Sequence, residues 1–557
     1  MGFGTTRRLQ MNTGIAVGAV AVMIFGLGSC ALGDEKDDAE VLVEQFTQLL
    51  DDRDVVSAAA LTSYPNAASA SIQQMFDGLK ADSVDYKVSQ YIPLDQSSGF
   101  FTLDAKWDLG KDRRWDYSVQ GSVRKLAVGW RISWDPTVVL PEFGHSRTVQ
   151  LVRTDAAAPR VLDPTGSPLM DEQTINAIKL DPTKMPDPVA TTTAVAKAIE
   201  PVAPLITSQS LMQDLVVARG QSITAVSLRD ADFEILGHAL VKIPGVVTEK
   251  QPKLIATDRR IVSPLLDALR NVWQSSRDAT AGWAVEVQEP DGSPAVRLTG
   301  FQGPPPPDVA ATLDPKLQLA AADAVVSVGT PATIVAIQPS TGAITAVAQN
   351  TYASDIGPIA LKGLYPAGTA LDIFNNAAGV LKGVAPKDVS PEDSMNAAAQ
   401  LGLGVDFKVP GLEEVTGQLP NQGAGMEKPD AWNGDNVMVS PFGMAMVAAS
   451  IARGNVPAPM IAFGQPATTD ANLTSIRSDV VDRLRVLMRE GVTKPNAQSV
   501  QAFSDVTGIA TQSGQDSWFI ANRGDLAFAV FIKDADGADQ AAKMAARLLR
   551  AMAKPQA

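Results

Sequence analysis

Two neighbouring segments carry the strongest local signals: Thr312–Val325, TLDPKLQLAAADAV, and residues 332–350, ATIVAIQPSTGAITAVAQN. In the first, Asp314 is expected to be a helix N-cap and Pro315 the first helical residue, because an aspartate side chain accepts from free backbone N–H groups and proline lacks one. In the second, apolar residues flank the turn Ser340–Gly342, which predicts a β-hairpin. The C-terminal part therefore begins with a helix and two antiparallel strands.

The far end of the chain repeats this pattern in reverse. Residues 517–521, a turn at 522–525 and residues 526–532 predict a second hairpin. Residues 537–553 then predict a helix whose expected buried side chains are Met544, Leu548 and Met552. The order is helix, hairpin, long helical insert, hairpin, helix. This layout resembles the serine transpeptidase/β-lactamase fold, and the two opening segments closely resemble the start of that domain in penicillin-binding proteins. Residues 304–557 are therefore expected to be a transpeptidase-like domain.

The N-terminal part has a different texture. An apolar helical pattern around Phe46 precedes residues 83–140, which predict four strands, Ser83–Leu94, Ser98–Leu109, Arg113–Leu126 and Gly129–Val139. The end of this region, Trp130–Phe143 (WRISWDPTVVLPEF), resembles the end of the NTF2-like N-terminal domain of some penicillin-binding transpeptidases. We therefore expect an NTF2-like α+β domain at residues 31–145.

The middle of the chain gives a partial match. Arg160–Leu169, RVLDPTGSPL, resembles the opening of the elongated pedestal, or dimerisation, domain of class B penicillin-binding proteins, with Val161 and Thr165 departing from the pattern. The stiff segment Gly303–Pro307 reads as a linker. The resemblance implies a pedestal at residues 146–303 and a multidomain α+β protein of the class B type.

Composition excludes several other functions. The chain has 557 residues, and at about 150 residues per domain it is long enough for three or four domains. Its net charge of −14 argues against binding to nucleic acid. One cysteine permits no internal disulfide, and the two histidines, His145 and His238, stand in unrelated contexts. We therefore expect no metal site, no cofactor and no Ser-His-Asp chemistry.

The single cysteine follows the long apolar run. After Arg7 and Arg8, residues 9–33 carry no charge, and Gly14–Gly28 has the length of a signal-peptide core. Leu27-Gly28-Ser29-Cys30 resembles the bacterial lipobox, which implies cleavage, lipidation of Cys30 and location on the extracytoplasmic face of the cell membrane. An uncleaved single-span anchor is the alternative, because 25 uncharged residues could cross a bilayer.

The resemblance implies three catalytic elements. The family uses a Ser at a helix N-terminus with a Lys three residues later, a Ser-x-Asn across the cleft, and a Lys-Thr-Gly on the edge strand. The spacing of the first pair places hydroxyl and amine on one helix face, so the amine can take the proton. The edge strand holds a substrate carboxylate and lines the oxyanion hole.

The first element is recognisable but altered. Tyr365–Phe374, YPAGTALDIF, matches the family's frame, with Thr369 at the nucleophile position and Asp372 at the base position. A threonine is stiffer at χ1 than a serine, and a carboxylate is a much weaker base for a hydroxyl than an amine. Asp372 also removes a cation beside the developing oxyanion.

The other two elements are altered as well. If Trp518-Phe519 fixes the alignment, Val506-Thr507-Gly508 occupies the Lys-Thr-Gly position and the carboxylate-binding cation is missing. Ser394-Met395-Asn396 is the one candidate for Ser-x-Asn, and we interpret it as a chance match because the spacing to Leu401-Gly402 is too short. Asn433–Ala445 still follows the family's scaffold sequence.

No displaced set of catalytic residues compensates for these changes. The one Ser-x-x-Lys, Ser122–Lys125, lies in a predicted strand, where positions three apart point to opposite faces. We expect acyl-enzyme chemistry to be lost, since removing interdependent catalytic groups costs on the order of a millionfold in rate.

Three functions remain open. The first is a lipid-anchored, non-catalytic scaffold or regulator of cell-wall synthesis, with synthesis proteins or peptidoglycan fragments as partners and weak β-lactam or peptide binding in the cleft. The second is an active D,D-transpeptidase with Thr369 as nucleophile and Asp372 as base. The third is ligand binding in an NTF2-like cavity lined by Trp115, Trp130 and Trp134, although these side chains suit the core of the sheet better.

Overall fold

The computed structural model describes residues 37–420 and 432–553. The expected signal segment, residues 1–30, and the expected lipidation site Cys30 lie outside these ranges. Among the described residues, no helix combines the length and apolar character that a bilayer crossing needs.

Contacts divide the chain into two compact units. Of the described residues, the first unit contains those up to 152 and 284–300, and the second contains those at 153–283 and from 301 onward. Each unit is itself a mixture of helices and sheets, so the predicted multidomain α+β class is confirmed.

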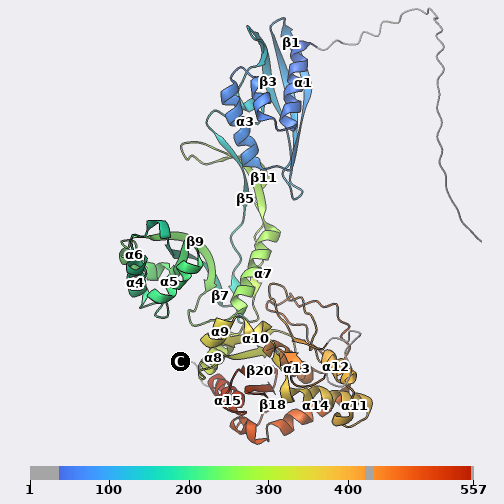
Figure 1. The fold of residues 1–557 in the computed structure, drawn as a ribbon. Helices are drawn as coiled ribbons and strands as arrows, with labels where there is room; N and C mark the ends of the chain where they lie inside the picture. Colours follow the sequence, from blue (N-terminus) through green and yellow to red (C-terminus); the bar gives the residue numbers. More distant parts are fainter. Residues whose placement is uncertain (1–36, 421–431, 554–557) are drawn as a thin grey trace, which may run out of the picture. The chain divides into compact units, whose positions relative to one another are not determined.

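The first unit packs helices against an antiparallel sheet of order β1-β2-β3-β4 (Figure 1). Along β2, alternate residues are buried, which is the pattern of a sheet covered on one face. The elements are α1 (Asp38–Asp51), α2 (Val55–Ala60), α3 (Pro65–Leu79), β1 (Ser83–Asp95), β2 (Ser98–Asp108), β3 (Arg114–Leu126) and β4 (Gly129–Ile132).

The fourth strand is shorter than predicted. It ends at Ile132 instead of Val139, because Pro136 cannot donate to a strand ladder and begins a short 3₁₀ helix, Pro136–Val138. Asp135 caps that helix by accepting from the backbone N–H of Thr137 at 2.9 Å. The chain thus leaves the sheet seven residues earlier than predicted.

A polar network fills the space between this sheet and its helices. The hydroxyls of Tyr86 and Tyr117 lie 3.0 Å apart, and the carbonyl oxygen of Val139 is 2.7 Å from each. The indole N–H of Trp107 donates to the Tyr117 hydroxyl at 3.0 Å. Burial raises the pKa of Tyr86 well above its ordinary value, so the network stays neutral.

The tryptophans expected at the sheet core divide into two groups. Trp115 and Trp134 are buried, as the core interpretation predicted. Trp130 is half-buried, and the Lys125 ammonium lies 5.9 Å from its ring centroid.

Two further sheets belong to the middle of the chain. One has the order β11-β10-β5, and the other has the path β12-β6-β7-β8 with β9 paired to β7. Their strands are β5 (Thr148–Thr154), β6 (Val161–Leu162), β7 (Pro168–Leu180), β8 (Ile223–Arg229), β9 (Val246–Ala256), β10 (Gly282–Gln288), β11 (Val296–Phe301) and β12 (Val309–Ala310). The accompanying helices are α4 (Pro188–Ile199), α5 (Ser208–Val217), α6 (Asp230–Leu240) and α7 (Leu265–Thr280).

The C-terminal part is built on an antiparallel sheet of order β14-β13-β20-β19-β18. Both predicted hairpins are confirmed, and Asp314 caps α8 by accepting from the N–H groups of Lys316 and Leu317. The elements are α8 (Pro315–Val325), β13 (Ala332–Ile337), β14 (Ile344–Gln349), β18 (Val506–Ser513), β19 (Asp516–Arg523), β20 (Leu526–Ile532) and α15 (Gln540–Ala553). The last helix starts three residues later than predicted, and Met552 is 37% exposed, so its predicted burial is wrong.

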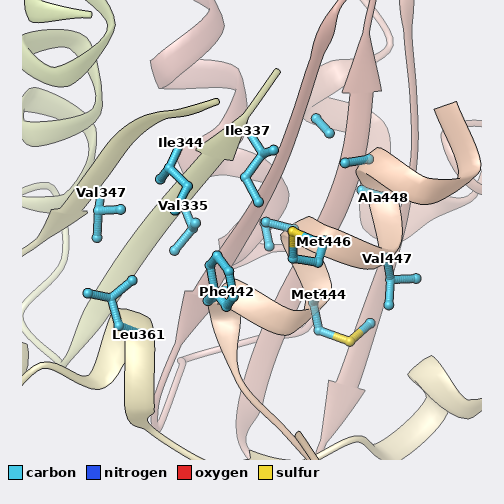
Figure 2. Close-up of a cluster of buried hydrophobic side chains, with 14 of the residues drawn as sticks. Val335, Ile337, Ile344, Val347, Leu361, Phe442, Met444, Met446, Val447 and Ala448 are labelled. Atoms are coloured by element: carbon cyan, nitrogen blue, oxygen red, sulfur yellow. The ribbon is translucent and has the colours of Figure 1, made fainter. Parts of the chain in front are cut away.

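Helices cover both faces of this sheet. α8 and α15 pack on one face, with Ile334, Phe519 and Phe528 among the buried side chains. α13 (Pro441–Arg453) packs on the other, where Figure 2 shows its Phe442 and Met446 close to Val335 and Ile337 of the sheet. Every residue of α13 from Pro441 to Ile451 is buried, which makes it the central helix of this part.

The segment between the two hairpins supplies the remaining elements. They are α9 (Thr351–Ile356), α10 (Ile359–Lys362), β15 (Tyr365–Pro366), α11 (Leu371–Lys382), α12 (Pro391–Gln400), β16 (Gly417–Gln418), β17 (Met438–Val439) and α14 (Ser478–Gly491), with short 3₁₀ turns between several of them.

One carboxyl in this segment is poorly solvated. Glu414 Oε1 accepts from the Phe407 N–H at 3.3 Å, while its Oε2 is buried with no hydrogen-bond partner among the described residues. Burial, helped by the nearby Asp406 charge, raises the pKa of Glu414 from 4.5 to about 8. The neighbouring Glu413 is exposed, and its bond to Lys362 lowers its pKa.

These opposite shifts predict opposite pH dependences. Between pH 4.5 and about 8 the folded state holds a proton on Glu414 that the unfolded state has lost, so stability falls as pH rises through this window. Glu414→Gln is therefore expected to raise the melting temperature relative to the parent at pH 9 much more than at pH 5, as measured by circular dichroism. Glu413→Gln is the control, and any effect it has on stability should be small and a loss at both pH values. An equal gain for Glu414→Gln at both pH values would contradict the assignment.

Candidate active-site region

Thr369 lies where β15 turns into α11. A short 3₁₀ turn, Gly368–Ala370, leads directly into the helix, and the Thr369 side chain is exposed. Gly368 has φ +52°, and a Cβ there would lie 2.3 Å from the Gln512 carbonyl oxygen and 2.6 Å from Ser513 Cβ. Only glycine fits such a close backbone approach, so the turn is fixed against the end of edge strand β18.

The Thr369 hydroxyl is engaged by the backbone of that strand. Its Oγ1 accepts from the Gln512 N–H at 3.2 Å and lies 3.4 Å from the Gln512 carbonyl oxygen. Because β18 is the last strand in the sheet order, this N–H is one that a ligand added to the sheet edge would otherwise meet. The hydroxyl therefore occupies the place of an incoming carbonyl oxygen.

Asp372 does not assist the hydroxyl. It is exposed in the first turn of α11, three residues after Thr369, and its carboxylate makes no hydrogen bond or ion pair among the described residues. The helix is anchored from the next turn instead, where Asn376 donates to the Asp372 carbonyl at 2.7 Å and accepts from Arg483 at 3.0 and 3.1 Å. Within the part of the chain that the structure describes, no basic side chain lies within hydrogen-bonding distance of Thr369 Oγ1.

Val506-Thr507-Gly508 does not lie beside Thr369. This segment starts β18, whereas Gln512 lies four residues beyond Gly508, about 13 Å further along an extended strand. Val506 is buried in the core on the α8 and α15 side. The residues that lie against the Thr369 turn are therefore Gln512 and Ser513. The alignment of residues 506–508 with the third motif stays a prediction.

The length of the turn between β18 and β19 sets which residues of β18 lie at its end. Ser513 pairs with Asp516, so β18 and β19 are joined by only two residues, Gly514 and Gln515. This short turn pairs Thr511 with Trp518. The pairing of β18 with β19 could not be predicted from Trp518 alone, because it depends on the length of the turn. The β18 residues from Ile509 to Thr511 are also uncharged, so the part of the edge strand between Gly508 and Gln512 carries no lysine either.

Thr511 is a further polar residue at the edge. It is 3% exposed, and its Oγ1 has no hydrogen-bond partner among the described residues. The Nε1 of its cross-strand neighbour Trp518 is also buried without a hydrogen-bond partner among the described residues. Trp518 stacks on Phe531 at 4.3 Å between ring centroids, and Phe531 on Tyr365 at 4.2 Å. This stack holds the strand that precedes Thr369 against the sheet, and burial raises the pKa of Tyr365.

A second glycine closes the other side of the turn. A Cβ on Gly434 would lie 2.7 Å from Gly368 Cα, and the Gly368 N–H donates to the Gly434 carbonyl at 3.0 Å. The Ala367 N–H donates to the Val437 carbonyl at 2.8 Å. Asn433 shapes this loop by accepting from the N–H of residue 435 at 3.0 Å. Residues 433–437 thus lie directly against the Thr369 turn, a contact that the scaffold resemblance alone did not indicate.

Ser394 has a packing contact of its own. It is 1% exposed in α12 and donates to Asn375 Oδ1 at 2.9 Å, while Trp432 Nε1 donates to the same oxygen at 2.8 Å. Asn396 lines a cavity of about 520 Å³ between α11, α12 and residues 471–473. Neither side chain hydrogen-bonds to Thr369 among the described residues.

The remaining singled-out residues lie elsewhere. Ser122 is in β3, as predicted, and His145 is exposed with Nε2 3.6 Å from an Asp135 carboxylate oxygen. His238 is exposed on α6. Within residues 37–420 and 432–553, no cluster of three or more His, Cys, Asp or Glu side chains has the arrangement of a metal site.

Comparison with known proteins identifies the N-terminal domain. A family model described as the NTF2-like N-terminal transpeptidase domain matches residues 38–147, close to the predicted 31–145. A search of curated proteins gave no match. The match shows that this part of the chain is similar to the N-terminal domain of transpeptidases, and it covers no residue after 147.

The contact between Gly368 and β18 can be tested with a matched pair. In Gly368→Ala the methyl group would meet the Gln512 carbonyl, whereas Gly464, also at positive φ (+82°), has open space around it. Both substitutions place an L-residue in left-handed backbone, which costs about 1–2 kcal/mol. We expect Gly368→Ala to destabilise clearly more than Gly464→Ala, and to speed amide exchange at Gln512 by hydrogen–deuterium exchange mass spectrometry. Equal destabilisation with unchanged Gln512 exchange would contradict the contact.

Proposed function

We propose that this protein is a lipid-anchored, non-catalytic member of the cell-wall synthesis machinery on the extracytoplasmic side of the membrane. In this proposal Cys30 carries the lipid, residues 146–303 act as a pedestal, and residues 304–557 use a transpeptidase-like fold to hold a partner. The family match to residues 38–147 supports the link to cell-wall transpeptidases.

The hydrogen bond between Gln512 N–H and Thr369 Oγ1, 3.2 Å long, carries the non-catalytic interpretation. Acyl transfer needs a hydroxyl activated by a base and free N–H donors aimed at the developing oxyanion. Here the edge-strand N–H already binds the hydroxyl that would have to attack, and Asp372 is exposed without contact to it. Both requirements are thus unmet by the same arrangement.

A scaffold or regulatory role suits the features that remain. The sheet, the central helix α13 and the close glycine contacts around Thr369 give a rigid surface without needing turnover. The proposed partners are cell-wall synthesis proteins or peptidoglycan fragments, with weak peptide or β-lactam binding in the cleft. Binding to a cell-wall synthesis protein would make this protein a regulator, whereas binding to peptidoglycan fragments would make it a scaffold.

Covalent labelling by a fluorescent penicillin tests the catalytic status. We expect no adduct on denaturing electrophoresis with the parent protein or with Thr369→Ser, because neither variant gains a base or frees the Gln512 N–H. An active serine transpeptidase in the same gel is the positive control, and an unchanged melting temperature shows that each variant is folded. Labelling that disappears in both Thr369→Ala and Asp372→Asn would establish the alternative, a D,D-transpeptidase with Thr369 as nucleophile.

The anchor is tested separately in cells. The parent is expected to incorporate a palmitate analogue and to partition into the detergent phase of Triton X-114. Cys30→Ala should lose the lipid label, since it has no thiol for the thioether bond. Equal labelling of parent and variant would exclude Cys30 as the lipidated residue.

A further inference from the structure

One end of the N-terminal sheet exposes a group of large apolar side chains. We call it the sheet-end surface, and it lies where the β1–β2 and β3–β4 turns meet. Its apolar members are between 44% and 69% exposed: Ile92, Leu94, Phe100, Leu126 and Val128. Scattered single apolar residues are normal on protein surfaces, but a contiguous group of them marks a binding site.

The strand register brings these residues together. Ile92 pairs with Phe100 across β1 and β2, and Arg124 pairs with both Ser98 and Arg131. The Lys125 N–H donates to the carbonyl of residue 97 at 2.8 Å, which joins the two turns. The register therefore places Ile92 beside Phe100, with Arg124 lying between this pair and Leu126 at the end of the sheet.

The helices leave this side of the sheet open. In β2, Gly99, Phe101 and Leu103 are buried toward the helices, so Phe100 points to the opposite face. Because Phe100 of β2 pairs with residue 122 of β3, Arg124 and Leu126 lie on the same face of the sheet as Phe100. Arginine and apolar side chains thus alternate on an uncovered face.

The chain enters the domain at this end of the sheet, on the helix-covered face, because Tyr91 pairs with the inward-facing Phe101. The Tyr91 hydroxyl donates to Asp37 Oδ2 at 3.0 Å, and Tyr91 immediately precedes Ile92. Asp37 is only seven residues after Cys30. A chain of that length spans at most about 25 Å when fully extended. If Cys30 is lipidated, as proposed above, the sheet-end surface is therefore held within reach of the bilayer.

The local charge favours an anionic surface. Arg124, Lys125 and Arg131 make no ion pair within the described residues, although the chain as a whole has a net charge of −14. The carboxylate at this end, Asp95, accepts hydrogen bonds from Ser97 and Ser98, and these bonds lower its pKa. The acidic first turn of α1 flanks the other side, so the cations gather on the β3–β4 side.

We propose that the sheet-end surface binds the headgroup region of an anionic phospholipid bilayer. Ile92, Phe100 and Leu126 would enter the interface while Arg124 and Arg131 contact lipid phosphates, as in peripheral membrane proteins that combine apolar area with basic residues. This contact would add a second attachment beside the proposed lipid, through buried apolar area and attraction to anionic headgroups.

Vesicle sedimentation with a non-lipidated chain tests the proposal. The chain from residue 31 contains every described residue, so it isolates the surface from the lipid. We expect it to sediment with vesicles of equal parts phosphatidylglycerol and phosphatidylcholine, and less with phosphatidylcholine alone. Arg124→Gln and Arg131→Gln should each weaken binding about fivefold, the effect of one cation at an anionic surface.

Apolar variants separate this surface from a general charge effect. The double variant Phe100→Asp with Leu126→Asp should abolish sedimentation with mixed vesicles. Val56→Asp is the matched control, because Val56 is 76% exposed in the same domain, beside Asp54 at the start of α2. Unchanged melting temperatures confirm that all variants fold.

Two results with vesicles would overturn the proposal. One is failure of the parent chain to bind either vesicle, and the other is equal binding by the parent and the double aspartate variant. Sedimentation without vesicles would indicate self-association and would also exclude a lipid surface as the occupant. None of these results bears on penicillin labelling or on lipidation of Cys30, so the two proposals fail separately.

Discussion

The close approach of three backbone segments at Gly368 is the constraint on which the rest of the C-terminal site depends. A Cβ on Gly368 would lie 2.3 Å from the Gln512 carbonyl oxygen, and a Cβ on Gly434 would lie 2.7 Å from Gly368 Cα. The turn before α11, the end of the edge strand and the loop after residue 432 therefore meet without side chains between them. This contact sets the position of Thr369 and directs its hydroxyl to the strand backbone, where the Gln512 N–H donates to it.

The packing of the C-terminal core is independent of the residues at the catalytic positions. The buried sheet, α13 and the aromatic stack of Trp518, Phe531 and Tyr365 do not involve Thr369 or Asp372, so their stability does not depend on a catalytic pair. A serine-based mechanism, by contrast, needs an amine beside the hydroxyl and an unoccupied N–H on the strand. Here the residue three positions after Thr369 is the exposed Asp372, and the Gln512 N–H is bonded to Thr369 Oγ1. Both observations support the proposed non-catalytic role.

Local signals made much of the fold predictable, and long-range register made the site less so. Asp314-Pro315 and the turn at Ser340–Gly342 act within a few residues, and both predicted elements formed. The end of β4 was misjudged because the pattern of alternation continued past Ile132 while Pro136 ended the ladder. The contact of Thr369 with Gln512 was not predicted, since the register of β18 depends on a two-residue turn that the sequence does not reveal. The role of Gly368 and Gly434 was not predicted either, because close approach between distant segments leaves no periodic pattern.

The N-terminal domain meets a different constraint, set by its connection to the preceding chain. Asp37 is bonded to Tyr91, so the first helix and the open end of the sheet are fixed to each other at the point where the chain enters. An apolar surface at that point would be a liability in a freely diffusing protein, because exposed apolar area favours association. If the proposed lipid at Cys30 holds the domain next to a bilayer, the surface is instead an additional contact, since the short tether raises the local concentration of lipid. The proposed lipid contact therefore depends on the closeness of the surface to the point of chain entry more than on the size of the surface.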